Sequence, residues 1–362
     1  MTIPAFRTPA SVRRVHRLRW LIISVLLVAP AVALAADDGA TATPLADLDD
    51  LTLHFGTNAP SKSPSGRAVE KFAQFVSERS NGQITVQIYP ANQLGSNRDM
   101  VEQTALGGLD MAMEGLGILG YVEPVYNLLQ VPFLFDSQAH IHKVLDGSIG
   151  QRLAASILEN RNIKLLSQTW DRLPRQLCSK KPIRSPEDMA NVLIRTGSKG
   201  ATQTFRLLGA KPSSIPLNEL YLALQNNVVN AVDLPADYIY NLSLYEVCPY
   251  MDVIDHTYGT QFVAMNRRVY EKLPPAYREI IEQAVADAGR FNNELDRSMD
   301  ADYAKRLEDN GMTVVHITSA QHQAFSDQVA DHIDELEAIW PATHGLGAEI
   351  RAAAPATPPS NN

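Results

Sequence analysis

The regular alternation of strand patterns and helix patterns limits the possible folds of this chain more than any other feature. Residues 51–115 contain a strand pattern, a helix pattern with Val69, Phe72 and Val76 at helical spacing, a second strand, a second helix and a third strand. Strands separated by single helices favour an α/β fold with a mostly parallel sheet. A second series of the same kind begins near residue 174, so the 362 residues are predicted to form two α/β units.

A long helical pattern follows the second series and covers residues 275–311. At 1.5 Å per residue such a helix is roughly 50 Å long, which is enough to cross from one unit to the other. A further helical pattern covers residues 319–340. The last residues, 346–362, end in a low-complexity stretch rich in alanine and proline, and we expect this tail to be disordered.

The N-terminus has the three parts of a secretory signal peptide. Five arginines precede the apolar run "WLIISVLLVAPAVALA", which ends in a small-x-small cleavage site at residues 33–35. The apolar run is short for a membrane-spanning helix and contains Pro30, so a cleaved signal peptide over residues 1–35 is favoured over an uncleaved anchor. The Arg13-Arg14 pair leaves both the general and the twin-arginine export routes open.

Charge excludes one class of partner. Cleavage removes five of the 32 basic residues and none of the 40 acidic ones, so the net charge changes from -8 to -13. An acidic exported protein lacks the basic surface that nucleic-acid binding requires. Residues 36–50 form a short polar leader. In an oxidising compartment Cys178 and Cys248 could pair, or they could remain two buried thiols, and the sequence does not decide between these possibilities.

The usual motifs of enzymes and cofactor sites are missing or out of context. The segment "GLGILG" at residues 115–120 resembles a dinucleotide-binding glycine pattern, but Pro124 and Pro132 interrupt the helix that should follow it. We interpret this segment as a loop that lines a cleft. The sequence contains no HExxH, no cysteine–histidine quartet and no GxSxG. It therefore predicts no cofactor, no metal and no enzymatic activity.

Arg195 is the most informative single residue. It ends the apolar strand pattern "NVLIRT", immediately before a turn and a helix that starts near Ser198. An arginine in this place can bind a carboxylate with both arms of its planar guanidinium group, and the helix start adds backbone N–H groups. The alternative is a salt bridge to an internal aspartate or glutamate. The residues alone do not separate these two interpretations.

The sequence resembles the DctP-type substrate-binding proteins of tripartite ATP-independent periplasmic (TRAP) transporters over about residues 51–345. The resemblance includes the segments "QLG" and "VPF", the run from Lys-Pro-Ile to the terminal arginine, and the Glu-x-Tyr-x-Ala-Leu-Gln helix. Four stretches carry it: residues 81–113, 129–135, 181–195 and 208–233. Together these motifs are specific, so the chain is identified as a member of this family.

The resemblance implies a two-lobe periplasmic-binding-protein fold (type II-like), with mixed sheets, flanking helices and a long helix spanning both lobes. It implies a monomeric periplasmic protein that captures an organic acid between the lobes and delivers it to TRAP membrane subunits. A periplasmic sensor for a membrane kinase and an exported enzyme are the alternatives. The expected boundaries are residues 51–173 and 260–298 for one lobe and 174–259 and 299–345 for the other.

The resemblance also implies which residues contact the ligand. The family's signature arginine falls on Arg195, and a second arginine of some members falls on Arg175. Where relatives place an asparagine beside the signature arginine this chain has Leu234, preceded by Asp233, which implies a more apolar pocket and a ligand with an apolar or aromatic body. Trp170 could pack against that body or belong to the core. Further contacts are expected from Asn58, Asn97, Glu114, Gly115, Leu217 and His256.

Overall fold

The computed structural model describes residues 45, 48–341 and 343–355. The predicted signal peptide and most of the polar leader lie outside the described residues. The first described strand begins at Leu51, where the sequence analysis places it. No helix within the described ranges is long and apolar enough to cross a membrane.

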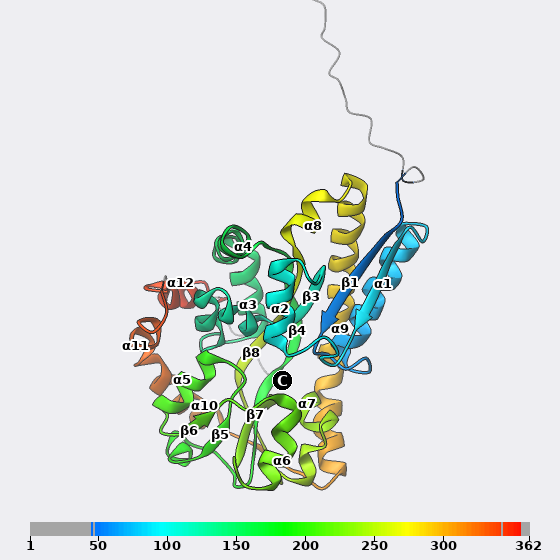
Figure 1. The fold of residues 1–362 in the computed structure, drawn as a ribbon. Helices are drawn as coiled ribbons and strands as arrows, with labels where there is room; N and C mark the ends of the chain where they lie inside the picture. The colour runs from blue at the N-terminus through cyan, green and yellow to red at the C-terminus, as the bar shows by residue number, and fades with distance from the viewer. Residues whose placement is uncertain (1–44, 46–47, 342, 356–362) are drawn as a thin grey trace, which may run out of the picture. The chain divides into compact units, whose positions relative to one another are not determined.

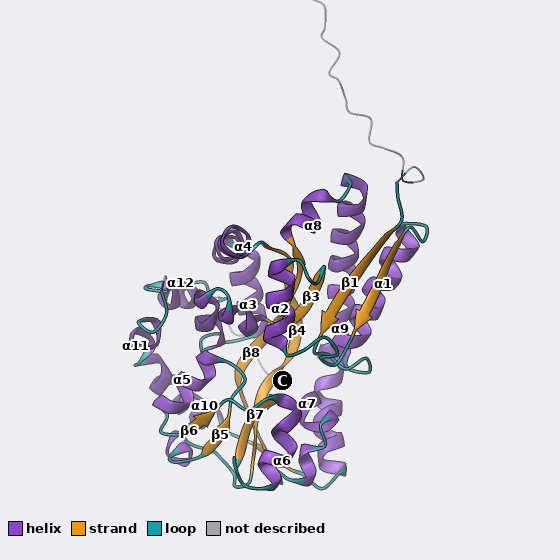
Figure 2. Ribbon diagram, viewed as in Figure 1, coloured by secondary structure: helices purple, strands orange, loops and turns teal. Residues whose placement is uncertain are grey.

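The strands of both α/β units belong to one continuous mixed sheet (Figures 1 and 2). In the described part of the chain this sheet has nine strands in the order β2-β1-β3-β8-β4-β7-β5-β6, and β9 pairs with β8. Their bounds are β1 Leu51–Thr57, β2 Ile84–Tyr89, β3 Met111–Gly115, β4 Ile163–Ser179, β5 Leu193–Arg195, β6 Lys211–Ser213, β7 Ala231–Pro235, β8 Tyr250–Asn266 and β9 Thr313–His316.

Two long antiparallel strands connect the two lobes of the fold. Strands β1, β2 and β3 are parallel and join the sheet where β3 pairs with residues 261–265 of β8. Strands β5, β6 and β7 are also parallel, and β7 pairs with residues 175–179 of β4. We call the part built on β1–β3 lobe 1 and the part built on β5–β7 and β9 lobe 2. The pairing of β4 with β8 shifts register several times between residues 165 and 177, where the chain passes between the lobes.

Helices cover both faces of this sheet. Local signals explain several of their ends: Ser96 and Asp99 form a capping box at the start of α2, and Gly107 ends it in a left-handed conformation. The bounds are α1 Pro64–Arg79, α2 Asn97–Leu106, α3 Gln138–Asp146, α4 Ser148–Arg161, α5 Lys199–Leu207, α6 Leu220–Gln225, α7 Ala236–Asn241, α8 Arg267–Lys272, α9 Pro275–Asp309, α10 Ser319–Ala330, α11 Ile333–Glu337 and α12 Leu346–Ala352.

The predicted long helix is confirmed as α9, which has 35 residues and an axial length of roughly 50 Å. It packs against α1 of lobe 1, along β4, and against α7 and β9 of lobe 2. In Figure 1 it runs beside both groups of strands. A single rigid element therefore contacts both lobes.

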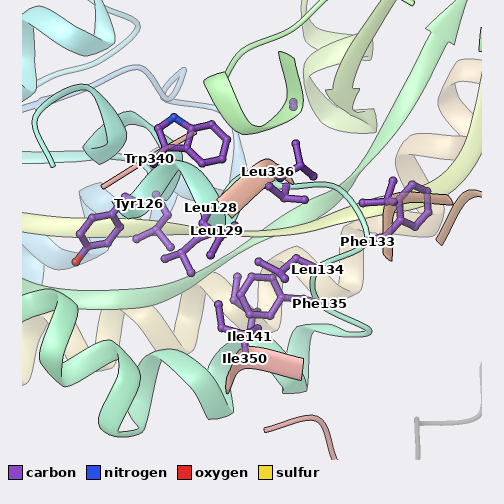
Figure 3. Packing of buried hydrophobic residues seen from close by; sticks show 14 of the residues in the cluster. Tyr126, Leu128, Leu129, Phe133, Leu134, Phe135, Ile141, Leu336, Trp340 and Ile350 are labelled. Carbon is purple, nitrogen blue, oxygen red and sulfur yellow. The ribbon is translucent and has the colours of Figure 1, made fainter. Parts of the chain in front are cut away.

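The C-terminal segment corrects one expectation. Residues from 346 were expected to be disordered, but α12 forms there, and Ile350 is fully buried. Figure 3 shows Leu336, Trp340 and Ile350 packed in the cluster that also contains Phe135 and Ile141. A helix of seven residues is marginal on its own in water, and this apolar contact with lobe 1 stabilises it. The tail beyond residue 355 lies outside the described residues.

The two cysteines form a disulfide. Cys178 lies in β4 and Cys248 lies just before β8, with their Cα atoms 6.0 Å apart. Both side chains are fully buried in the apolar cluster of lobe 2. The bond ties together two segments that are 70 residues apart in the sequence, which limits the freedom of the unfolded chain between them.

Candidate ligand-binding site

A cavity of about 680 Å³ lies where the ends of β3, β5 and β7 meet the crossing strand β4. This volume is within the usual range for small-molecule sites. The walls come from the loop before α2, the segment after β3, the β5–α5 turn, the loop after β6 and the start of α7. Its lining includes Asn58, Asn92, Asn97, Gly115, Tyr121, Gln130, Arg172, Arg175, Arg195, Gly197, Ser198, Leu217, Asn218, Leu234 and Tyr238.

Arg195 lies in the cavity wall without an internal counter-ion. Its side chain follows the end of β5, the residue is 8% exposed, and its Nε donates to the carbonyl oxygen of Ile215 at 2.9 Å. Among the described residues no carboxylate oxygen lies within 4.0 Å of its guanidinium group. Burial and the neighbouring charge of Arg175 lower the pKa of Arg195 to about 10, so the group remains charged at neutral pH. The internal salt bridge considered for Arg195 is therefore not what the structure shows.

Arg175 has a partner inside the protein. Its Nε donates to Oδ1 of Asp233 at 2.5 Å, and its Nη2 donates to the backbone oxygen of the same residue. His256 approaches the same carboxylate oxygen from behind, with Nε2 at 3.0 Å. Burial alone would raise the pKa of Asp233, but Arg175 and His256 more than offset this effect and hold it well below its usual range. Asp233 and His256 thus position Arg175 and do not line the cavity themselves.

Glu114 lies behind the opposite part of the wall and organises two amide groups there. Its Oε1 accepts the backbone N–H of Asn58 at 3.0 Å, and its Oε2 accepts Nδ2 of Asn97 at 2.9 Å. Both asparagines line the cavity, whereas Glu114 is fully buried. Burial raises the pKa of Glu114 to about 8, and Arg172 and the two donors lower it only in part.

The structure brings seven of the predicted site residues to the cavity wall: Asn58, Asn97, Gly115, Arg175, Arg195, Leu217 and Leu234. Trp170 is not among them. Its side chain is 1% exposed and lies in the core of lobe 1, where its indole ring packs against Gly289 of α9. The sequence analysis expected that Trp170 could pack against a ligand. The structure places it in the core instead, because α9 covers this side chain.

Several wall residues were missed by the sequence analysis. The most notable is Arg172, which lies three residues before Arg175 on β4; its guanidinium group lies 5.0 Å from the ring centre of Tyr238. Tyr238 also lines the cavity, and its hydroxyl donates to Oδ1 of Asn58 at 3.5 Å. The pair of arginines in "WDRLPRQ" was the available signal, since charged residues are rare on a buried strand.

Comparison with known proteins assigns the fold and its family. Residues 55–338 match the model of the DctP family, described as bacterial extracellular solute-binding protein, family 7. The chain belongs to the DctP family. The match covers both lobes and all the strands that frame the cavity, and it ends before α12.

Relatives of this DctP-family chain have been named or solved with ligands. The 2,3-diketo-L-gulonate-binding periplasmic protein YiaO of Escherichia coli K12 is 28% identical over 79% of this chain and 86% of its own. A TRAP periplasmic solute-binding protein from Ochrobactrum anthropi, solved with its C-terminus bound in the ligand-binding pocket, is 30% identical, with a TM-score of 0.75 over 84% of this chain and 96% of its own. One from Desulfovibrio salexigens with bound orotic acid is 26% identical, with a TM-score of 0.77 over 83% and 98%.

Membership in the DctP family settles the general role. The protein is an extracytoplasmic solute-binding protein of a non-enzymatic family that works with TRAP membrane subunits, and relatives such as YiaO and the Desulfovibrio salexigens protein bind small organic acids. The site fits this role chemically. Two guanidinium groups without internal carboxylate partners, Arg172 and Arg195, and one paired guanidinium group, Arg175, face a cavity large enough for a small anion. The residues that hold the ligand are a separate question.

Proposed function

We propose that this protein captures an organic acid in the cavity by binding its carboxylate to Arg195, with Arg175 beside it. The observation that carries the proposal is the missing counter-ion of Arg195, since a buried charge without a partner is costly unless a ligand supplies one. Nη1 of Arg195 and Nη2 of Arg175 both point toward Gly197, at 3.2 and 3.5 Å from the place where a Cβ would be. Gly197 lacks this atom, so an anion can approach both groups.

The surrounding backbone supports an anion at this point. Ser198 caps α5 by accepting the backbone N–H of Ala201, and both Gly197 and Ser198 line the cavity. The N-terminus of α5 therefore adds partial positive charge next to Arg195. A bidentate arginine–carboxylate pair strengthens further when the lobes exclude water.

The wall beside these arginines favours a ligand with an apolar part. Leu234 and Leu217 line the cavity on the lobe 2 side. In contrast, Asn58 and Asn97 of lobe 1, both held by Glu114, provide polar contacts. Asn97 donates its amide group to Glu114, which leaves its side-chain oxygen to accept a ligand hydroxyl.

We further propose how this binding is used. A cleaved signal peptide over residues 1–35 releases a monomer into the periplasm, with lobes bounded as the sequence indicates (51–173 with 260–298, and 174–259 with 299–345). The lobes close on the acid by a hinge in β4 and β8, where the strand register shifts. The closed form then docks on the TRAP membrane subunits.

A thermal-shift screen of residues 36–362 against organic acids tests the carboxylate site. A ligand at about 100 times its dissociation constant adds about 2.7 kcal/mol to the free energy of unfolding, which raises the melting temperature measurably. We expect Arg195→Ala to abolish the shift, and Arg206→Ala, at the exposed end of α5, to leave it unchanged. Equal shifts in the native protein and in Arg195→Ala would overturn the proposed role of Arg195.

A further inference from the structure

Arg172 lies on β4 between two shifts of strand register, where the chain passes from one lobe to the other. Its guanidinium carbon lies 5.0 Å from the ring centre of Tyr238 in lobe 2. Its Nη1 lies 2.6 Å from the place where a Cβ of Gly115, at the end of β3 in lobe 1, would be. The guanidinium group thus occupies the space between the two lobes, at the wall of the cavity.

Arg172 has no acidic partner in the described chain. No carboxylate oxygen lies within 4.0 Å of it, whereas Arg175 is paired with Asp233 at 2.5 Å. The neighbouring Glu114 uses its two oxygens to accept hydrogen bonds from Asn58 and Asn97. The charge of Arg172 offsets part of the effect of burial on the pKa of Glu114, but no oxygen of Glu114 lies within 4.0 Å of the guanidinium group, so the two do not form a salt bridge.

A purely structural role of Arg172 does not explain why its N–H donors face the cavity. The contact with Tyr238 is a cation–π interaction, which uses one face of the guanidinium plane and none of its five N–H donors. Arg172 lines the open cavity, where water can reach those donors. They lose water when a ligand fills the space, and a ligand without a matching acceptor leaves them unpaired.

The two unpaired guanidinium groups of the cavity lie next to different elements. Arg195 and Arg175 approach Gly197 in the β5–α5 turn of lobe 2, and Arg172 approaches Gly115 at the end of β3 in lobe 1. Asp233 is the only described carboxylate within 4.0 Å of any of these three arginines. Three positive charges therefore face one negative charge, and a ligand with a single carboxylate balances only part of the excess.

We propose that Arg172 binds a second acidic group of the ligand, so that the site selects dianionic acids over the corresponding monocarboxylates. This inference rests on the proposed function, in which Arg195 and Arg175 hold the first carboxylate. Arg172 then acts as the residue that determines specificity at the other end of the ligand. Because it lies between Gly115 and Tyr238, its contact with the second acidic group also links the ligand to both lobes.

Matched pairs of acids test the inference by isothermal titration calorimetry. The probes are succinate with butyrate, galactarate with galactonate, and phthalate with benzoate, each pair differing by one acidic group. For any pair that binds, we expect the dianion to bind at least about tenfold more tightly to the native protein, because the monoanion leaves Arg172 unpaired. Arg172→Gln should remove most of this ratio, and Arg172→Lys, which keeps the charge but loses the planar fork, should give an intermediate ratio.

Two further variants separate this inference from the proposed function. Arg195→Gln should weaken both members of a pair, whereas Arg206→Gln, at the exposed end of α5 and outside the cavity wall, should change neither the affinities nor their ratio. Binding that needs Arg195 but shows no preference for dianions would overturn the role of Arg172 and keep the proposed function. Binding of no probe, or binding that ignores Arg195, would overturn both. Circular dichroism of each variant confirms that it is folded.

Discussion

Glu114 shows how one buried carboxyl group organises the wall of the cavity. It fixes the backbone of Asn58 and the amide orientation of Asn97, which belong to different segments of lobe 1. No residue close in sequence to Glu114 takes part in this arrangement. An acidic residue at the end of a buried strand can therefore have a positioning role without touching the ligand.

Glu114 gives the folded protein a defined pH dependence. Its pKa is raised from 4.5 to about 8, mainly by burial, so between these values the folded state keeps a proton that the unfolded state has released. The free energy of unfolding should therefore fall as pH rises from about 4.5 to 8. Glutamine does not titrate, so we expect the stability of the native protein relative to Glu114→Gln to decrease over this interval and to level off above it. Urea unfolding from pH 5 to 9 measures the stability of both proteins. A difference between the native protein and Glu114→Gln that stays the same at every pH would contradict this prediction.

The pair of Arg175 and Asp233 gives a second prediction. Arg175→Ala leaves the carboxylate of Asp233, which is 1% exposed, without its main counter-ion. Breaking a buried pair in this way costs about 3 kcal/mol, since one charge stays buried without compensation. We expect the double variant Arg175→Ala/Asp233→Asn to recover part of the loss, because it removes the orphaned charge. Urea unfolding at pH 7 measures both changes, and equal stability of the single and double variants would show that the unpaired carboxylate of Asp233 carries no penalty.

The lowered pKa of Asp233 also predicts how the free energy of unfolding changes with pH. The lowered pKa of Asp233 stabilises the folded protein above the ordinary carboxyl pKa, and this contribution is lost as pH falls toward the lowered value. The difference in stability between the native protein and Asp233→Asn should therefore shrink on acidification below about pH 4. A constant difference down to pH 2.5 would mean that folding does not lower the pKa of Asp233.

At the scale of elements, the position of α5 depends on close backbone packing. A Cβ at Gly200 would lie 2.4 Å from the backbone oxygen of Asn127 in the 3-10 segment Pro124–Gln130. This contact sets the start of α5, which carries Ser198 and Gly197 at the cavity wall. The glycine thus lets two elements approach closely enough to shape the site.

We predict that Gly200→Ala destabilises the protein by about 1–3 kcal/mol, because backbone atoms must move to admit the methyl group. Ligand affinity should also decrease, since the N-terminus of α5 shifts. Gly108→Ala is the matched control, because its Cβ would meet nothing closer than 3.8 Å. Thermal unfolding and ligand titration of both variants provide the check, and identical behaviour of the two would refute the packing argument.

The elements that sequence patterns found and missed differ in a physical way. The amphipathic helix α1 and the edge strand β2 each have one buried face, so their spacing predicted them. Strand β8 was missed, although it has 17 residues, because it is paired on both sides and its last seven residues are all buried, which removes the alternation. Helix α12 was missed because it has only seven residues and borders the alanine- and proline-rich tail, and a helix this short depends on the tertiary packing of Ile350.

Register shifts explain why the site was predicted only in part. Arg195 could be found because it ends a short regular strand. Arg172 could not, since β4 is irregular between Ser167 and Leu177 and the period-two rule no longer tells which side chains face the cavity. Trp170, two residues earlier, turns instead into the core.

At the scale of the whole molecule, neither lobe is built from one continuous stretch of chain. Strand β3 of lobe 1 pairs with β8, and α1 packs on α9, so lobe 1 needs segments that follow lobe 2 in the sequence. We predict that a fragment of residues 48–173 does not fold alone, because the apolar faces of β3 and α1 remain uncovered. Far-ultraviolet circular dichroism and amide dispersion in nuclear magnetic resonance spectra measure this, with residues 48–355 as control. A cooperatively folded fragment would contradict the prediction.

The same pairing has a consequence for biosynthesis. Met111 of β3 pairs with Met265 of β8, which the ribosome adds 154 residues later. While the chain is being made, β3 therefore has an open edge, and lobe 1 cannot be completed until both β8 and α9 have been synthesised. Native structure that depends on such distant segments forms late. On the general export route, which threads chains through a membrane pore before they fold, this delay would keep the nascent chain in a state that can still be translocated.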